Sequence, residues 1–191
     1  MTQPNKIFDA LLVLECQAGS KKAMTLLVKR WHAKLCKQAY WYTKDSDQAK
    51  DIAQDSWGVI LNKIQFLKDP NSFGSWAITI TTRKSIDWLR KQKKERNNLE
   101  TNYDLPHQTV DNNDTVAIDP ILLMVRSSIK ELPQKQQIVL HLFYLEEFSI
   151  KQIADALGIS TGTVKSRLFT AREKLKTILK NRNYEKQNGR Y

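Results

Sequence analysis

The sequence predicts an all-α chain made of two small helical domains joined by a flexible acidic linker. Apolar residues recur every three or four positions in both halves, which is the period of one face of an α-helix. No alternating strand-like run and no Asn-Gly hairpin signal interrupts this pattern. Charge also divides the chain, because two basic blocks flank a stretch of five acidic and no basic side chains. We therefore expect domains at 1–96 and 121–191 and a linker at 97–120.

The composition favours a polyanionic partner. The chain has 191 residues, with 31 Lys and Arg against 20 Asp and Glu, a formal net charge of +11. An excess of this size is typical of proteins that bind nucleic acid. No apolar stretch approaches the roughly 18 residues of a membrane span, and no signal-peptide pattern occurs at the N-terminus. We expect a cytoplasmic protein without membrane insertion.

The two cysteines and their neighbours predict reduced thiols and no metal site. Cys16 and Cys36 lie in helical segments, and such sparse cysteine favours two buried thiols over a disulfide. His32 and Cys36 share one helical face, where they would provide two metal ligands. No second pair completes four-coordination, so we expect no bound metal.

In the first block, helical spacing marks three segments. The first contains Leu27, Trp31 and Leu35. Residues 45–47 offer N-caps for the second, and residues 70–72 break the chain before the third, which ends in the basic run 90–96. The linker that follows has five Asn, two Pro and no periodicity.

Residues 149–172 predict a helix-turn-helix. Ser149 caps the first helix, and Gly158 supplies the turn. Ser160 or Thr161 caps the second helix. The inward positions are Ile153, Ala154 and Leu157 on the first helix and Val164, Leu168, Ala171 and Leu175 on the second.

The outer face of the second helix is polar and cationic, which suits the major groove of duplex DNA. The plain alternative is a helical hairpin with a solvated basic face, but a small residue at the crossing, a glycine turn and a cap occur here together. The candidate duplex-binding residues are Thr161, Thr163, Lys165, Ser166, Arg167, Phe169, Thr170 and Arg172.

Several motifs resemble those of extracytoplasmic-function (ECF) RNA polymerase sigma factors of the sigma-70 family. Residues 129–133 (IKELP), 143–146 (FYLE), 157–160 (LGIS) and 162–168 (GTVKSRL) are similar to region 4, parts of which response regulators share. Residues 47–57 (DQAKDIAQDSW) and the helix at 73–91 are similar to region 2. The resemblance implies a transcription initiation factor with core RNA polymerase, promoter DNA and an anti-sigma factor as partners.

An acidic strip in the first block predicts a protein-binding surface. Asp51 and Asp55 are one helical turn apart, with Gln54 beside them, in an otherwise basic block. Such a strip repels DNA and suits a protein partner, whereas the plain alternative is a solvated helix face. The resemblance implies that it docks on a coiled coil of the largest polymerase subunit.

The third helix mixes cations with tryptophans, which is typical of single-stranded DNA binding. We expect Trp76 in the core and Trp88 exposed. The resemblance implies that the preceding loop, residues 65–72, receives a base flipped out of the melted minus-10 element. The candidate single-strand residues are Lys68, Asn71, Ser72, Arg83, Lys84, Asp87, Trp88, Arg90 and Lys91.

The chain departs from the family pattern at four positions. Lys84 stands where Asn is usual, and Glu147 stands where Gly is usual. Gln137 replaces a common Arg, and Thr161 takes a place that is often Glu or Pro. Of these four residues, Lys84 and Thr161 lie close to the expected DNA surfaces and bear on promoter preference.

Three other classes of function compete with a sigma factor. An enzyme is disfavoured, because the sequence has no Gly-rich phosphate loop, no Ser/His/Asp order and no paired carboxylates; we expect no catalytic residues, cofactor or small-molecule substrate. A helix-turn-helix regulator that does not bind core polymerase remains open, as does a helical RNA-binding protein. Specific run-off transcription on adding the protein to core polymerase discriminates a sigma factor from both.

Overall fold

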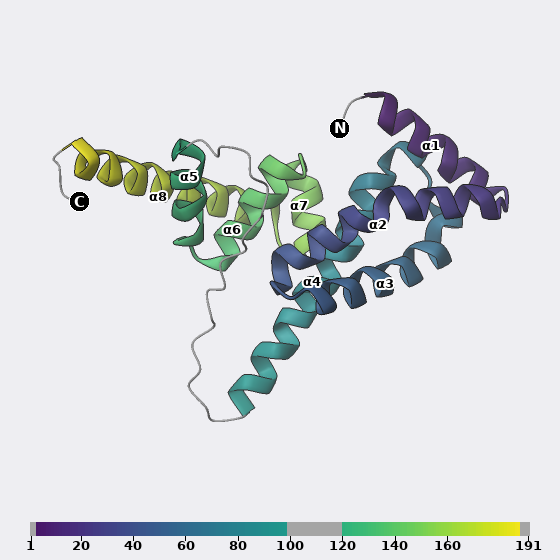
Figure 1. The fold of residues 1–191 in the computed structure, drawn as a ribbon, viewed down its shortest axis with the longest axis horizontal. Helices are drawn as coiled ribbons and strands as arrows, with labels where there is room; N and C mark the ends of the chain where they lie inside the picture. The colour runs from purple at the N-terminus through teal and green to yellow at the C-terminus, as the bar shows by residue number, and fades with distance from the viewer. Residues whose placement is uncertain (1–2, 99–119, 188–191) are drawn as a thin grey trace. The chain divides into compact units, whose positions relative to one another are not determined.

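The computed structural model describes residues 3–98 and 120–187, which form helices and short connections (Figure 1). They make up two compact units, which we call the N-terminal unit (α1 to α4) and the C-terminal unit (α5 to α8). No strand occurs among these residues, so the all-α prediction is confirmed. The predicted linker at 97–120 lies outside the described residues except at its ends, because α4 continues to Asn98 and α5 begins at Pro120.

The N-terminal unit contains four helices, drawn from purple to teal in Figure 1. They are α1 (Gln3–Gln17), α2 (Lys21–Thr43), α3 (Ser46–Lys63) and α4 (Phe73–Asn98). Two short 3-10 turns, Ile64–Phe66 and Pro70–Ser72, connect α3 to α4. Because α2 packs against α1, α3 and α4, it forms the centre of the unit.

The core of this unit is built on large apolar and aromatic side chains. Leu27, Leu35 and Ile60 are fully buried. The rings of Trp31 and Phe73 meet edge to face with centroids 5.5 Å apart. A Cβ on Gly74 would lie 2.6 Å from Trp31 Cη2, closer than any real contact, so glycine is required where α4 crosses this ring.

The connection between α2 and α3 follows the predicted capping chemistry. Lys44 ends α2 in the left-handed backbone region, with φ of 55°. Asp45 then caps α3, because its Oδ1 accepts hydrogen bonds from the backbone N–H groups of Asp47 at 2.8 Å and Gln48 at 3.0 Å. Of the three predicted caps at 45–47, Asp45 performs this role.

The C-terminal unit consists of α5 (Pro120–Lys130), α6 (Gln134–Leu140), α7 (Ile150–Leu157) and α8 (Thr161–Gln187), with a π-helical turn at His141–Leu145. The other three helices all pack against α8, which is therefore the central helix of the unit. The core positions are almost purely apolar, and several side chains have no exposed surface: Val139, Leu142, Ile153, Val164 and Ala171.

The predicted helix-turn-helix is present with its expected local chemistry. Ser149 Oγ accepts from Gln152 N at 3.2 Å, and Gln152 Oε1 accepts from Ser149 N at 2.9 Å, which completes a capping box. Gly158 ends α7 in the left-handed region with φ of 63°. Ser160, rather than Thr161, caps α8, because its Oγ accepts from Thr163 N at 3.1 Å.

The π-helical turn is a feature that the sequence pattern does not predict. Glu146 N donates to His141 O at 3.2 Å, five residues back, where an α-helix would use the carbonyl four residues back. The chain then turns at Glu147, whose φ of 55° lies in the region that favours glycine. This conformation gives a physical reason for the usual Gly at this position of the family pattern.

The thiols differ in burial. Cys16 is buried, as predicted, but Cys36 is only half-buried, so the prediction of two buried thiols is wrong for Cys36. Desolvation raises the pKa of both thiols above the ordinary value.

Within the described ranges no helix has the length and apolar character needed to cross a membrane.

Candidate functional site

The acidic strip lies on the outer face of α3. Asp51, Gln54 and Asp55 are all exposed, whereas Ile52, Ala53 and Ser56 between them are buried. Helical periodicity therefore separates the strip from the core. Close to its N-terminal end, the hydrogen bond from Lys50 to Asp47 raises the pKa of the Lys50 amine.

All the predicted single-strand cations except Lys68 lie along the middle of α4, and three of them pair with carboxylates of their own unit. Lys84 Nζ lies 3.5 Å from Asp55 Oδ2 on α3. Within α4, Arg90 pairs with Asp87 at 3.2 Å and Lys91 pairs with Glu95 at 3.9 Å. Arg83 and Asp87 are exposed. Part of the positive charge of this surface is therefore neutralised locally.

The two tryptophans of α4 do not divide as the sequence predicts. Trp88 is half-buried and packs against a cluster of Ala39, Ala49 and Ile52, so the prediction that it is exposed is wrong. Trp76 is also half-buried, rather than a core residue, with its ring centroid 6.1 Å from that of Phe73. For Trp88, packing against residues of α2 and α3 decides the position.

The loop at 65–72 is held by a contact that sequence reasoning missed. Gln17 Nε2, at the end of α1, donates to Ile64 O and Leu67 O, both at 2.9 Å. Lys68 and Asn71 are exposed and Ser72 is half-buried. Asp69 Oδ1 accepts from Asn71 N at 3.0 Å, and Ser72 Oγ donates to Asp69 O. The loop therefore has a defined shape.

An exposed aromatic side chain in this loop was also missed. Phe66 is 80% exposed, although phenylalanine is normally buried. It lies between Ile64, which is buried in the core, and the exposed Lys68, which the sequence analysis singles out. The only signal in the sequence is its place outside any helical period, which is weak evidence for exposure.

The outer face of α8 presents most of the predicted duplex-binding residues. Six are exposed, and Thr163 and Arg167 are half-buried at the margins. Some polar groups are already used locally, because Thr163 Oγ1 contacts Ser160 Oγ and Ser166 Oγ donates to Thr163 O. Phe169 is 66% exposed.

Arg172 is fixed by the π-helical turn. Its Nε donates to Tyr144 OH at 2.9 Å, and its guanidinium carbon lies 5.4 Å and 5.6 Å from the ring centroids of Phe143 and Tyr144. The sequence places Arg172 among the DNA contacts but does not predict its contacts with Phe143 and Tyr144, which belong to another element; Tyr144 lies 28 residues earlier in the chain.

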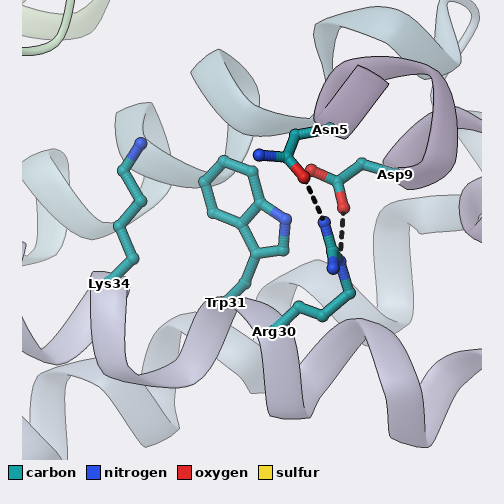
Figure 2. A pocket seen from close by; sticks show the side chains of 5 residues that line it. All are labelled: Asn5, Asp9, Arg30, Trp31 and Lys34. Carbon is teal, nitrogen blue, oxygen red and sulfur yellow. Dashed lines mark hydrogen bonds and ion pairs between the residues drawn. The ribbon is translucent and has the colours of Figure 1, made fainter. Parts of the chain in front are cut away.

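A pocket of about 280 Å³ lies between α1 and α2 and is lined by none of the predicted site residues (Figure 2). Arg30 Nε reaches Asp9 Oδ1 at 2.9 Å, and Arg30 also contacts Asn5. Lys34 lies over the Trp31 ring, 4.8 Å from its centroid. Because its charged groups interact with one another across the two helices, we interpret the pocket as a packing feature.

Metal ligands do not gather among the described residues. His32 Nε2 and Cys36 Sγ lie 3.5 Å apart, as their helical spacing predicts. No group of three or more His, Cys, Asp and Glu side chains comes together in the described part of the chain. Nothing in this geometry assigns a metal or cofactor to the three surfaces.

Comparison with known proteins identifies both units. Residues 27–95 match the family described as Sigma-70 region 2, and residues 122–175 match Sigma-70, region 4. The RNA polymerase sigma factor SigV of Bacillus subtilis is 32% identical over 134 residues, 70% of this chain and 76% of that protein. The ECF RNA polymerase sigma-E factor of Haemophilus influenzae is 29% identical over 177 residues, covering 88% and 93%.

Two solved structures share the fold. CnrH, solved in complex with the cytosolic domain of CnrY, is 22% identical, has a TM-score of 0.59 and covers 91% of this chain and 98% of that one. The sigma factor RpoE of Bartonella quintana, solved with the anti-sigma factor NepR, is 20% identical with a TM-score of 0.59, covering 83% and 98%. With its two matched regions and these relatives, the chain belongs to the ECF group of the sigma-70 family of RNA polymerase sigma factors.

Proposed function

We propose that this ECF sigma factor divides promoter opening among the three surfaces described above. The acidic strip of α3 docks on core RNA polymerase, the loop at 65–72 and α4 hold the melted minus-10 strand, and α8 reads the minus-35 duplex. The observation that carries this division is the placement of acidic and basic surfaces on adjacent helices of one unit, with the duplex-reading helix in the other. The domains at 1–96 and 121–191 are the corresponding functional modules.

The N-terminal unit supplies the chemistry that single-stranded DNA needs. The α4 cations Arg83, Lys84, Arg90 and Lys91 follow the phosphate backbone, and the exposed ring of Phe66 offers a face on which an unpaired base stacks. Lys68, Asn71 and Ser72 present polar groups to the edge of a flipped base.

The C-terminal unit supplies duplex recognition. The capped N-terminus of α8 enters the major groove, where Thr161 and Lys165 reach base edges and phosphates. Phe169 contacts apolar groups such as a thymine methyl. Arg172 acts chiefly by tying α8 to the π-helical turn, because Tyr144 already occupies its Nε.

The chain acts as a cytoplasmic initiation factor and not as an enzyme. Relatives of the same fold were solved with CnrY and with the anti-sigma factor NepR, and an anti-sigma partner that covers the docking surfaces would control this chain in the same way. The isolated protein binds promoter DNA weakly and with a steep salt dependence, because phosphate contacts dominate its affinity.

Reconstitution with core RNA polymerase tests the division. Asp51→Lys is expected to weaken polymerase binding about tenfold, because it reverses a charge in the docking strip.

Lys165→Ala is expected to leave polymerase binding intact and to lower run-off transcription about five- to tenfold. Lys176→Ala, an exposed lysine further along α8, is the matched control. Unchanged transcription by Lys165→Ala would refute the assignment of α8.

A further inference from the structure

We propose that Asp55 couples polymerase docking to strand capture by holding Lys84 in the free protein and releasing it when polymerase binds. The inference rests on the proposed function, because it takes α3 as the docking helix and α4 as the strand-capturing helix. In the free protein the Lys84 ammonium is held at the side of α3. When a cationic group of polymerase contacts Asp55, Lys84 turns to the phosphates of the single strand.

The geometry places one ion pair between two surfaces with different partners. Lys84 Nζ and Asp55 Oδ2 are 3.5 Å apart, and they belong to α4 and α3 respectively. The Lys84 side chain is 32% exposed, whereas that of Asp55 is 73% exposed. A protein partner therefore reaches Asp55 without first displacing Lys84.

The helix packing around this pair is rigid, which leaves the lysine stem as the moving part. Trp88, one turn beyond Lys84, packs against Ala49 and Ile52 of α3 and so fixes the register of the two helices. Ser85, beside Lys84, is fully buried. A lysine has a flexible four-carbon stem, so changing its partner requires only side-chain rotations.

The pairing of the other α4 cations is of a different kind. Arg90 pairs with Asp87 and Lys91 with Glu95, three and four residues away on the same helix. Neither carboxylate belongs to the docking strip, so polymerase binding on α3 leaves these two pairs unchanged. Among the three pairs described for α4, that of Lys84 is thus the one that responds to docking, and Lys84 stands where the family usually has Asn.

The ion pair between Lys84 and Asp55 is weak, so the expected change in single-strand affinity is small. Exposed ion pairs of this kind shift an equilibrium only about two- to fivefold, so competition by a polymerase cation is sufficient to break the pair. By linkage, polymerase then raises the affinity for single-stranded DNA by the same factor by which single-stranded DNA raises the affinity for polymerase. Removing Asp55 should abolish this part of the coupling.

The test measures single-strand affinity with the full chain. A fluorescein-labelled oligodeoxythymidylate is titrated at low ionic strength, with the protein alone and with the protein saturated with core RNA polymerase, against a core-only baseline. Asp55→Asn is compared with Asp51→Asn, which removes the same charge one turn away in the same exposed strip. Both measurements are repeated in a Lys84→Gln background.

We expect Asp55→Asn to raise the affinity of the free protein about two- to fivefold more than Asp51→Asn does. This extra gain should vanish in the polymerase complex and in the Lys84→Gln background. Equal effects of the two Asn variants, or a gain that persists without Lys84, would overturn the coupling.

These data, together with a titration of each variant with core RNA polymerase, separate failure of the coupling from failure of the proposed function. If Lys84→Gln lowers single-strand affinity but the two Asn variants behave alike, α4 keeps its strand-capturing role and the coupling is refuted. If Lys84→Gln leaves the single-strand affinity of the polymerase complex unchanged, where Lys84 should be released, both ideas fail for Lys84. If neither Asn variant weakens polymerase binding, the docking role of the strip fails, and with it the release step.

Discussion

Different kinds of internal contact stabilise the N-terminal unit and the C-terminal unit of this sigma factor. In the N-terminal unit, polar side chains join helices that are far apart in the sequence, as in the buried hydrogen bond from Gln38 Nε2 to Thr82 Oγ1 at 3.0 Å. The C-terminal unit has an almost purely apolar core, and its polar contacts between elements, from Arg172 to Tyr144 and from Arg182 to Ser127, are not fully buried. The comparison teaches that the first unit buries a specific polar contact between its helices, whereas the core of the second depends on apolar burial.

The two helices for which we propose DNA binding, α4 and α8, also differ in the pairing of their cations. Three cations of α4 are paired with carboxylates, one of them on the neighbouring helix. On α8, no carboxylate of the described residues pairs with Lys165 or Arg167. Under the proposed function, Lys165 and Arg167 would bind DNA without breaking an ion pair, whereas Lys84, Arg90 and Lys91 would first have to leave their carboxylate partners.

The largest expected effect comes from the apolar core of the C-terminal unit. Ile153→Ala is expected to cost about 2 to 5 kcal/mol, because it leaves a cavity at a fully buried position. All five tryptophans lie in the N-terminal unit, so their fluorescence reports that unit alone, whereas far-UV circular dichroism reports both. We expect the dichroism transition to split or move to lower temperature while the fluorescence transition stays. Equal shifts of both transitions would contradict independent units.

The polar links of the N-terminal unit should give the next largest effect. Thr82→Val keeps the side-chain shape but removes the acceptor of the Gln38 amide, which is expected to cost about 1 to 3 kcal/mol. Tryptophan fluorescence during chemical denaturation measures the loss. Thr79→Val on the same helix is the control, because the Thr79 hydroxyl bonds only its own helix, at Ser75 O. Equal costs for the two variants would remove the distinction between cross-helix and local polar contacts.

Local caps should matter less but still measurably. Ser149→Ala breaks the capping box of α7 and is expected to cost about 1 kcal/mol in the C-terminal unit. Far-UV circular dichroism should detect this loss, with tryptophan fluorescence unchanged. Ser166→Ala, which removes an exposed hydroxyl from α8, should have little effect on stability. A cost for Ser149→Ala no larger than that for Ser166→Ala would contradict the role of the cap.

The smallest expected effect is a gain. Glu147 has a left-handed backbone with φ of 55°, so Glu147→Gly relieves strain, partly offset by the greater freedom of glycine in the unfolded chain. We expect the stability of the C-terminal unit to rise by less than about 1 kcal/mol. Glu147→Ala, which keeps a Cβ, should give no such gain. A loss of stability in Glu147→Gly would show that the Glu147 side chain contributes more than its backbone costs.

The parts of the candidate site that lie on one face of a single helix were predictable from the sequence. The strip of Asp51, Gln54 and Asp55 and the outer face of α8 follow directly from helical periodicity. The partners of these residues were not predictable in the same way. Nothing near Lys84 in the sequence indicates Asp55, and nothing near Arg172 indicates Tyr144, because each partner belongs to another element. The predicted exposure of Trp88 failed for the same reason.

The sequence alone determined the helices, the capping box of Ser149, the turn at Gly158 and the inward stripe of α8, because the hydrogen bonds and steric limits behind these features act within about four residues. Only the tertiary structure decided the contacts between elements, such as the support of the 65–72 loop by Gln17, 47 residues before Ile64. Such contacts depend on the rotation and crossing of whole helices. That arrangement is set by the packing of many side chains together, so no short stretch of sequence carries it.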